Sequence, residues 1–132
     1  MESSTWENMA AGPVIIENGK ILLDREMKDN AITPWFFPGG GAEERDLNPE
    51  ETCKREAREE LSIEIEIIRQ LKTIKTVHKN KEIILKHFLA KRTGEIKPGL
   101  DIADWGWFDI NNLPENCAQN VLEIINDIKK EI

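Results

Sequence analysis

Three glutamates in the segment REAREEL (55–61) are the residues best suited to chemistry. Glu56, Glu59 and Glu60 have the spacing that a helix brings onto about one turn. Carboxylates this close repel one another, and a hard divalent cation relieves the repulsion. Proteins commonly hold Mg²⁺ with a few carboxylates, substrate phosphate oxygens and waters. The segment therefore predicts a magnesium site that works on phosphates.

A solvated, charged helix face is the alternative interpretation. Glu51–Arg55 and Arg55–Glu59 have the spacing of ion pairs that stabilise a helix without any ligand. A glycine-rich turn, Pro38-Gly39-Gly40, lies just before the helix. Its position favours the metal site over the charged face.

Length and composition indicate one globular domain, and we expect it to span residues 1–132. The chain is 39% hydrophobic and 33% charged, which is typical of a folded rather than a disordered protein. It has no apolar run of about 18 residues for a membrane span, and MESSTWENMA lacks the features of a signal peptide. We expect a cytoplasmic protein that does not contact membranes.

The net charge of −7 argues against a partner that is a nucleic-acid polymer, because such binding needs a basic surface. A small anionic substrate remains compatible if metal ions bridge it to protein carboxylates. Cys53 and Cys117 are too few for a disulfide framework or a zinc site. Cys53 falls on an apolar helix stripe and is expected in the core, and His78 and His87 are expected to be surface or strand residues.

Apolar patterning predicts a β-β-β-α-β-β-β-α order with a mixed sheet between two helices, an α/β (α+β) fold. Asn-Gly at 18–19 predicts a hairpin between strands 13–17 and 20–23. A polar loop is expected over 26–33 and a short strand over 35–37. The later strands are expected at 63–68, 71–77, 82–91 and 104–108.

Two helices are expected. The first should start with Asn48 as the cap and Pro49 at the first helical position, with Glu51 placed for a capping box, and run to about Leu61. Apolar residues recur at helical spacing from Ala118 to Ile128, which predicts a last helix that packs on the domain.

The stretch from Pro38 to Ile63 resembles the Nudix box. The pattern of that family is Gly, five residues, Glu, seven residues, then Arg-Glu-U-x-Glu-Glu-x-Gly-U, where U is aliphatic. Residues 55–63, REAREELSI, match its second half. The Asn-Gly hairpin before the box and the Trp-Phe-Asp-x-x-x-Leu-Pro segment after it are also similar to this family, so the resemblance covers most of the chain. It implies a Nudix-type α/β/α sandwich, similar to MutT.

The box departs from the pattern at two places. Five residues after Gly40 stands Asp46 rather than Glu, and eight residues then precede Arg55. We take Asp46 as the displaced acid, with Glu43 and Glu44 as alternatives. Ser62 replaces the glycine that ends the helix, which costs ~1 kcal/mol in a left-handed cap.

The resemblance implies a role for each box residue. The glutamates Glu56, Glu59 and Glu60 bind Mg²⁺ or Mn²⁺, and one of them, most often the one matching Glu56, acts as general base on water. Arg55 orients the glutamates. Gly39 and Gly40 let the backbone approach the helix end. The reaction is hydrolysis of a nucleoside diphosphate linked to another group X.

Residues outside the box add candidates. Asp104 is similar in place to the late metal-binding acid of MutT-type enzymes, with Asp101 as the alternative and loop solvation as the plain interpretation. Asn120 resembles the MutT-type asparagine that reads a purine edge, although it also suits a helix start. Arg25 could contact phosphate or base, or lie on the surface. Trp35, Phe37 and Trp107 could stack on a base or belong to the core.

The substrate stays open at this level. The favoured reading is a MutT-like nucleoside triphosphate pyrophosphohydrolase that acts on oxidised purine nucleotides such as 8-oxo-dGTP and releases a monophosphate and pyrophosphate. ADP-ribose or nucleotide-sugar hydrolysis is the second, weakened because no proline follows the box over 76–81. The lack of any Tyr weakens a dinucleoside polyphosphate substrate. A catalytically silent nucleotide-binding domain is the third. We expect a monomer or a homodimer.

Overall fold

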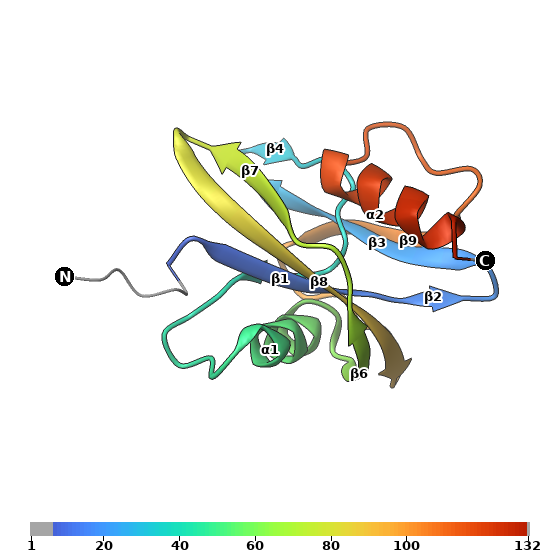
Figure 1. Cartoon of the computed structure of the whole chain (residues 1–132), viewed down its shortest axis with the longest axis horizontal. Helices are drawn as coiled ribbons and strands as arrows, with labels where there is room; N and C mark the ends of the chain where they lie inside the picture. Colours follow the sequence, from blue (N-terminus) through green and yellow to red (C-terminus); the bar gives the residue numbers. More distant parts are fainter. Residues whose placement is uncertain (1–6, 132) are drawn as a thin grey trace.

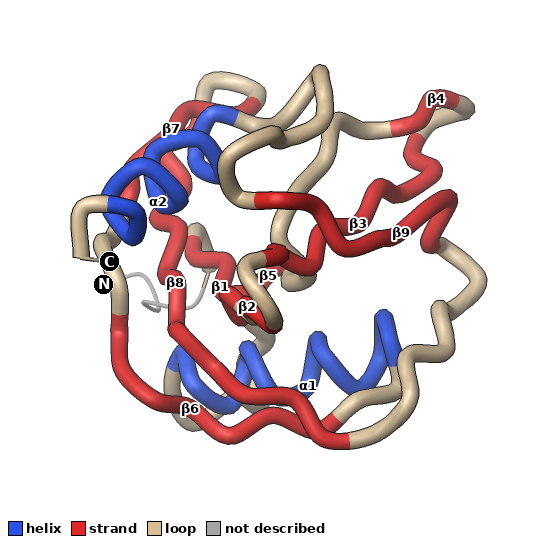
Figure 2. Tube along the Cα trace, turned by 90° about the vertical axis from the view of Figure 1, so that its right-hand side faces the viewer, coloured by secondary structure: helices blue, strands red, loops and turns tan. Residues whose placement is uncertain are grey.

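The computed structural model describes residues 7–131. Two β-sheets lie between two helices, with α1 (Pro49–Leu61) on one side and α2 (Gln119–Lys129) on the other, as Figures 1 and 2 show. This arrangement confirms the predicted α+β sandwich with a mixed sheet. Among the described residues, no helix is both long and apolar enough to span a membrane.

The larger sheet is mixed in direction. Its order is β5-β1-β8-β6, and β7 also pairs with β8. The pair β1–β8 is parallel, whereas the other pairs are antiparallel. The strands are β1 (Met9–Val14), β5 (Gly40–Gly41), β6 (Glu64–Gln70), β7 (Ile74–His78) and β8 (Lys81–Thr93).

The second sheet is antiparallel and centres on β3, which pairs with β2, β4 and β9. Its strands are β2 (Ile16–Glu17), β3 (Lys20–Lys28), β4 (Ala31–Ile32) and β9 (Ile102–Asp109). The predicted hairpin at Asn18-Gly19 is confirmed, and both residues take the positive φ that its tight turn needs (54° and 75°).

Two sequence predictions in this region were wrong. The expected loop over 26–33 is a second hairpin, because β3 runs on to Lys28 and turns at Asp29-Asn30 into β4. Asp and Asn also tolerate positive φ, here 50° and 63°, so they can close a hairpin without glycine. The expected strand over 35–37 makes only two isolated bridges, Asp24↔Phe36 and Trp35↔Cys117.

Helix α1 follows its local signals. The Asn48 side chain accepts a hydrogen bond from the Glu51 backbone N–H at 2.9 Å, and Pro49 opens the helix. The stripe of Cys53, Ala57 and Leu61 is fully buried, which confirms Cys53 as a core residue. The helix ends at Ser62 with a φ of 62°, the left-handed cap that usually favours glycine.

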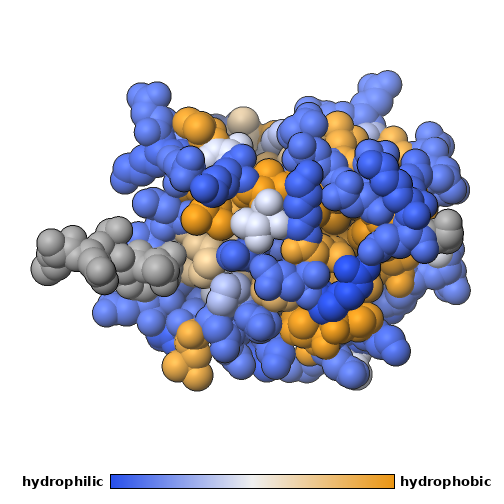
Figure 3. All heavy atoms as spheres, viewed as in Figure 1, coloured by the Kyte–Doolittle hydropathy of each residue, from blue (hydrophilic) through white to orange (hydrophobic). Residues whose placement is uncertain are grey.

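Strand β3 divides the core between the two helices. Ile21 and Leu23 pack in the cluster that α2 covers, whereas Leu22 packs with Ala57 and Leu61 of α1. Successive side chains of a strand point to opposite faces. Asp24 and Glu26 therefore continue the Leu22 face, toward α1. The exterior seen in Figure 3 is mostly hydrophilic, with smaller apolar areas between the charged side chains.

Candidate active site

The glutamates of α1 pack against the glycine turn. Oε2 of Glu60 accepts a hydrogen bond from the Gly39 backbone N–H at 3.1 Å. The Glu56 carboxylate lies so close to Gly40 that a Cβ there would stand 2.6 Å from Oε1 of Glu56. Gly39 has a φ of 146°, which side-chain-bearing residues rarely adopt. The turn therefore needs glycine at 39 for its backbone and at 40 for space.

Arg55 organises the outer side of this helix turn. Its Nε and Nη2 donate to the two oxygens of Asp46 at 2.9 Å each, and its Nη1 donates to Glu56 at 3.1 Å and to Glu59 at 3.0 Å. The guanidinium holds the pKa of the Asp46 carboxyl well below its usual range. Asp46, the preferred candidate for the displaced acid, thus makes the two-bond contact, whereas Glu43 makes a single contact at 3.2 Å.

Asp24 is a buried acid that the sequence analysis missed. It is 3% exposed, and its carboxyl contacts that of Glu60, which is 9% exposed. Burial is the main cause that raises the pKa of both groups, and the mutual contact adds to the rise for Glu60. The pKa of Glu56 is also raised, chiefly by burial. The available signal was the acid at the end of the apolar run ILLD, two residues after a core-facing leucine.

The carboxylates fit a divalent cation by their chemistry. Among residues 7–131, no three His, Cys, Asp or Glu side chains are already gathered closely enough to hold a metal ion. Oδ2 of Asp24 is nonetheless buried without a hydrogen-bond donor, beside a second buried carboxyl. Two such groups need a shared proton or a cation between them. Glu56 and Glu60 are the box residues on this side, whereas Glu59 is half exposed and also binds Arg45 at 3.2 Å.

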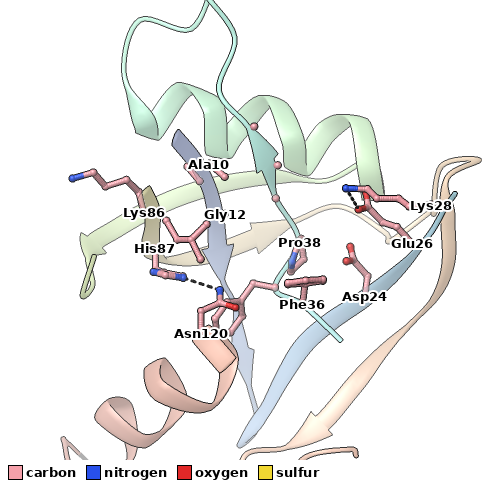
Figure 4. A pocket seen from close by; sticks show the side chains of 16 residues that line it. Ala10, Gly12, Asp24, Glu26, Lys28, Phe36, Pro38, Lys86, His87 and Asn120 are labelled. Atoms are coloured by element: carbon pink, nitrogen blue, oxygen red, sulfur yellow. Dashed lines mark hydrogen bonds and ion pairs between the residues drawn. The ribbon is translucent and has the colours of Figure 1, made fainter. Parts of the chain in front are cut away.

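A pocket of about 230 Å³ runs along the glycine turn, and Asp24 and Glu26 are the acids in its lining. Asp24 and Glu26 lie at one end and His87 and Asn120 at the other, with Phe36 and Pro38 between them (Figure 4). Its lining comes from β1, β3, the glycine turn, β8 and the start of α2. The lining residues are Ala10, Ala11, Gly12, Asp24, Glu26, Lys28, Phe36, Phe37, Pro38, Gly39, Gly40, Gly41, Leu85, Lys86, His87 and Asn120.

Asn120 and His87 form a polar pair at the far end of this pocket. Nδ2 of Asn120 lies 3.0 Å from Nε2 of His87, and Nδ1 of the same ring lies 2.9 Å from the Lys72 carbonyl oxygen. A carbonyl only accepts, so Nδ1 carries the proton and Nε2 accepts from Asn120. Burial lowers the pKa of His87, which keeps the ring neutral. His87 is a strand residue, as expected, but no sequence pattern predicted this contact.

Two predicted site residues pair with each other instead of joining the glutamates. Arg25 binds Asp104 across the β3–β9 pairing at 3.1 Å and lies over the Trp35 ring at 4.3 Å. It follows Asp24 on the strand, so it points to the opposite face and does not line the pocket. The structure therefore does not bring Arg25 or Asp104 to the box carboxylates.

The predicted stacking residues lie mostly in the core. Trp35 and Phe37 are buried, and Trp107 is half-buried beneath Arg92. Phe36, which the sequence analysis did not single out, is 36% exposed and lines the pocket. It is the aromatic side chain best placed to meet a ligand there.

The sandwich fold and the glutamates against the glycine turn define a Nudix enzyme. The family model of the NUDIX domain matches residues 7–127, and the chain belongs to this family. It is a Nudix hydrolase, of the class that acts on nucleoside diphosphate derivatives. No curated protein sequence gives a significant match.

Solved structures show the same fold. The MutT NUDIX hydrolase from Burkholderia pseudomallei is 24% identical, with a TM-score of 0.82 over 92% of this chain and 97% of that one. The MutT protein from Methanosarcina mazei Go1 is 20% identical, with a TM-score of 0.81 over 93% of each chain. An ADP-ribose pyrophosphatase from Streptococcus suis is 19% identical, with a TM-score of 0.69 over 92% of this chain and 91% of that one.

Proposed function

We propose that this Nudix hydrolase is an Mg²⁺-dependent nucleoside triphosphate pyrophosphohydrolase that releases a nucleoside monophosphate and pyrophosphate. The observation that carries the proposal is the pocket with two unlike ends, acids at one and the Asn120–His87 pair at the other. A nucleoside triphosphate suits both ends. Mg²⁺ bridges its phosphates to the acids, and its base presents hydrogen-bonding edges to the polar pair. Oxidised purine nucleotides such as 8-oxo-dGTP are the first substrates to test.

The acid end supplies the hydrolytic machinery in this proposal. Glu56, Glu59 and Glu60 hold Mg²⁺, or Mn²⁺ in its place, and Asp104 is the proposed late ligand. When bound, the metal neutralises phosphate charge and lowers the pKa of the attacking water. Glu56 accepts the proton from that water, because its carboxylate is largely buried and its raised pKa suits a base.

Other residues orient these groups and the substrate. Arg55 holds Glu56 and Glu59 in place through its hydrogen bonds. The backbone of Gly39 and Gly40 leaves room for phosphate beside the glutamates. Arg25 remains the proposed phosphate contact outside the box, although its present partner is Asp104.

The other end of the pocket selects the base. Asn120 turns its amide N–H toward His87, which leaves its amide oxygen and second N–H for a purine edge. Phe36 offers a partly exposed ring on the path between the two ends. Stacking on an aromatic ring contributes ~1–3 kcal/mol per base.

A product assay tests the proposal. The protein is incubated with Mg²⁺ and a panel of nucleoside triphosphates, 8-oxo-dGTP, ADP-ribose, nucleotide sugars and dinucleoside polyphosphates, and pyrophosphate is resolved from phosphate. Monophosphate plus pyrophosphate from one triphosphate supports the proposal. Turnover of ADP-ribose or a nucleotide sugar alone would replace it with that activity, and nucleotide binding without turnover would indicate the silent domain.

The cellular location, domain extent and oligomeric state of the enzyme are proposed from the sequence alone. A cytoplasmic location, a single domain over residues 1–132 and a monomer or homodimer all stay predictions. Light scattering after gel filtration measures the oligomeric state.

A further inference from the structure

Asp24 is held rigidly at the acid end of the pocket. Its backbone N–H donates to the Phe36 carbonyl and its carbonyl accepts from the Phe36 N–H, both at 2.9 Å. On its other side, β3 pairs Asp24 with Trp105 of β9. The side chain is 3% exposed and lines the pocket. Strand pairing therefore holds the Asp24 backbone on both sides, and its buried carboxyl lies in the pocket lining.

The surroundings of this carboxylate lack a compensating positive charge among the described residues. Oδ2 receives no hydrogen bond. The charged groups that act on the Asp24 carboxyl, Glu60, Glu26 and Glu56, are all acids. Lys28 is paired with Glu26 at 3.3 Å, and Arg25 points to the opposite face.

A purely structural buried acid would look different. Buried polar groups in proteins nearly always have hydrogen-bond partners, and buried charges are paired or coordinate metals. Oδ2 of Asp24 has no hydrogen-bond donor and the carboxyl contacts that of Glu60, and carboxylate oxygens are the ligands that Mg²⁺ and Mn²⁺ take. The contact with Glu60, a box glutamate, ties Asp24 to the metal site of the proposed function.

We propose that Asp24, from β3 and outside the box, is a ligand of the catalytic divalent metal together with Glu60. This inference rests on the metal dependence in the proposed function. It gives the metal site a carboxylate from the strand layer as well as from the helix. Because β3 also lines the pocket, the same strand would both bind the metal and form part of the substrate pocket.

A Mn²⁺ titration of the substrate-free protein tests the assignment, with free Mn²⁺ followed by its electron paramagnetic resonance signal at neutral pH. Asp24→Asn is expected to weaken Mn²⁺ binding by at least about tenfold. Asp29→Asn is the matched control, because it removes the same charge from an exposed turn at the end of the same strand, where Asn suits the positive φ. It is expected to bind Mn²⁺ like the wild type.

Unchanged Mn²⁺ affinity in Asp24→Asn would overturn the inference and leave Asp24 and Glu60 as a pair that shares a proton. The metal dependence of the proposed function would survive that result. A wild-type protein that binds no Mn²⁺ would overturn both. The two failures are therefore distinguishable.

A second measurement does not depend on the folding of Asp24→Asn. Protein with ¹³C only in its aspartate carboxyls is loaded with Mn²⁺ and examined by electron–nuclear double resonance. Only the aspartates carry ¹³C. A labelled carboxyl whose oxygen binds Mn²⁺ therefore belongs to an aspartate and not to a box glutamate. The coupling should persist in Asp104→Asn, and its absence from that variant would overturn the assignment to Asp24.

Discussion

Nε2 of His87 accepts a hydrogen bond from Nδ2 of Asn120 at 3.0 Å, across 33 positions of sequence. The second ring nitrogen donates to the Lys72 carbonyl, so the ring cannot rotate without losing one of the two bonds. A buried, neutral His87 thereby fixes which way the Asn120 amide faces the pocket. The orientation of the proposed base-reading group is set by a strand on which it does not lie.

His87→Phe should disturb base selection more than chemistry. The apolar ring fills the site but removes the acceptor for Asn120 and the donor for Lys72. We expect KM for the preferred nucleotide to rise by about tenfold, a change of about 1.4 kcal/mol, with kcat nearly unchanged. Steady-state kinetics on nucleotides that differ only in the base measures this.

Asn120→Ala provides the companion variant. If His87 acts through Asn120, the double variant should lose no more than either single one, because the two changes remove one interaction. An unaltered base preference in both single variants would refute the role of this end of the pocket.

Glu56→Gln and Glu60→Gln should each reduce kcat by about 100-fold or more while the fold stays intact, because each removes a charge from the acid end. Glu60 is buried and Glu56 is largely buried, and burial raises the pKa of both, so loss of the charge should not lower the melting temperature of the metal-free protein. EDTA should abolish wild-type turnover, and Mg²⁺ should restore it. Near wild-type rates in both variants would show that the site is wrongly assigned.

Gly40→Ala should impair activity through Glu56. The new Cβ would lie 2.6 Å from the Glu56 carboxylate and displace it, and a shift of this kind can cost about 100-fold in rate. Gly41→Ala is the neighbouring control, because nothing lies within 4 Å of its Cβ. We expect kcat to fall in the first variant only, with similar melting temperatures for both. Equal kcat values for Gly40→Ala and Gly41→Ala would show that the position of Glu56 does not affect catalysis.

Asp46→Asn should destabilise the protein by about 2 kcal/mol at neutral pH, because it breaks the charge-assisted pair with Arg55. The folded pKa of Asp46 lies below its unfolded value of about 4. The unfolded state therefore takes up the proton first, so this stability is present above about pH 4 and is lost as the pH falls.

Urea unfolding at a series of pH values measures the effect. The difference between wild type and Asp46→Asn should shrink as the pH drops below about 4. Glu43→Gln, which removes an exposed contact to the same arginine, should change stability by about 0–1 kcal/mol. A difference that is independent of pH would contradict the assigned ion pair.

Ser62→Gly should stabilise the protein without changing its activity. The φ of 62° suits glycine, which favours the variant by ~1 kcal/mol, and loss of the exposed hydrogen bond from Ser62 Oγ to the Lys97 carbonyl offsets part of this. Ser62→Ala loses the bond and keeps the strain, so it should be less stable than wild type. The urea midpoints of wild type, Ser62→Gly and Ser62→Ala give their order of stability. A midpoint for Ser62→Ala at or above that of Ser62→Gly would contradict the prediction.

The helix of the site could be predicted almost entirely from local sequence. Asn48 and Pro49 start it, the stripe through Cys53 and Leu61 buries one face, and the spacing of Glu56 and Glu60 places two acids on one turn. These signals act within a few residues, so no knowledge of the rest of the chain is needed. The Asn18-Gly19 turn was predictable for the same reason.

The contacts between elements were not predictable in this way. Asp104 resembles a late metal ligand by position, and no local pattern predicted its ion pair with Arg25, 79 positions away, which the strand register creates. The Asp29-Asn30 hairpin was missed because its residues also suit loops, and only pairing in the sheet distinguishes the two.

The sequence by itself determined the family, the box helix and the identity of the acids on it, because helix periodicity and capping are local. Only the tertiary structure decided that Asp24 meets Glu60 and that His87 holds Asn120. Both contacts depend on which face of a strand a side chain occupies and on how the strands and helices stack. A shift of one residue along a strand would send each side chain to the other face, so the packing of the whole domain fixes them.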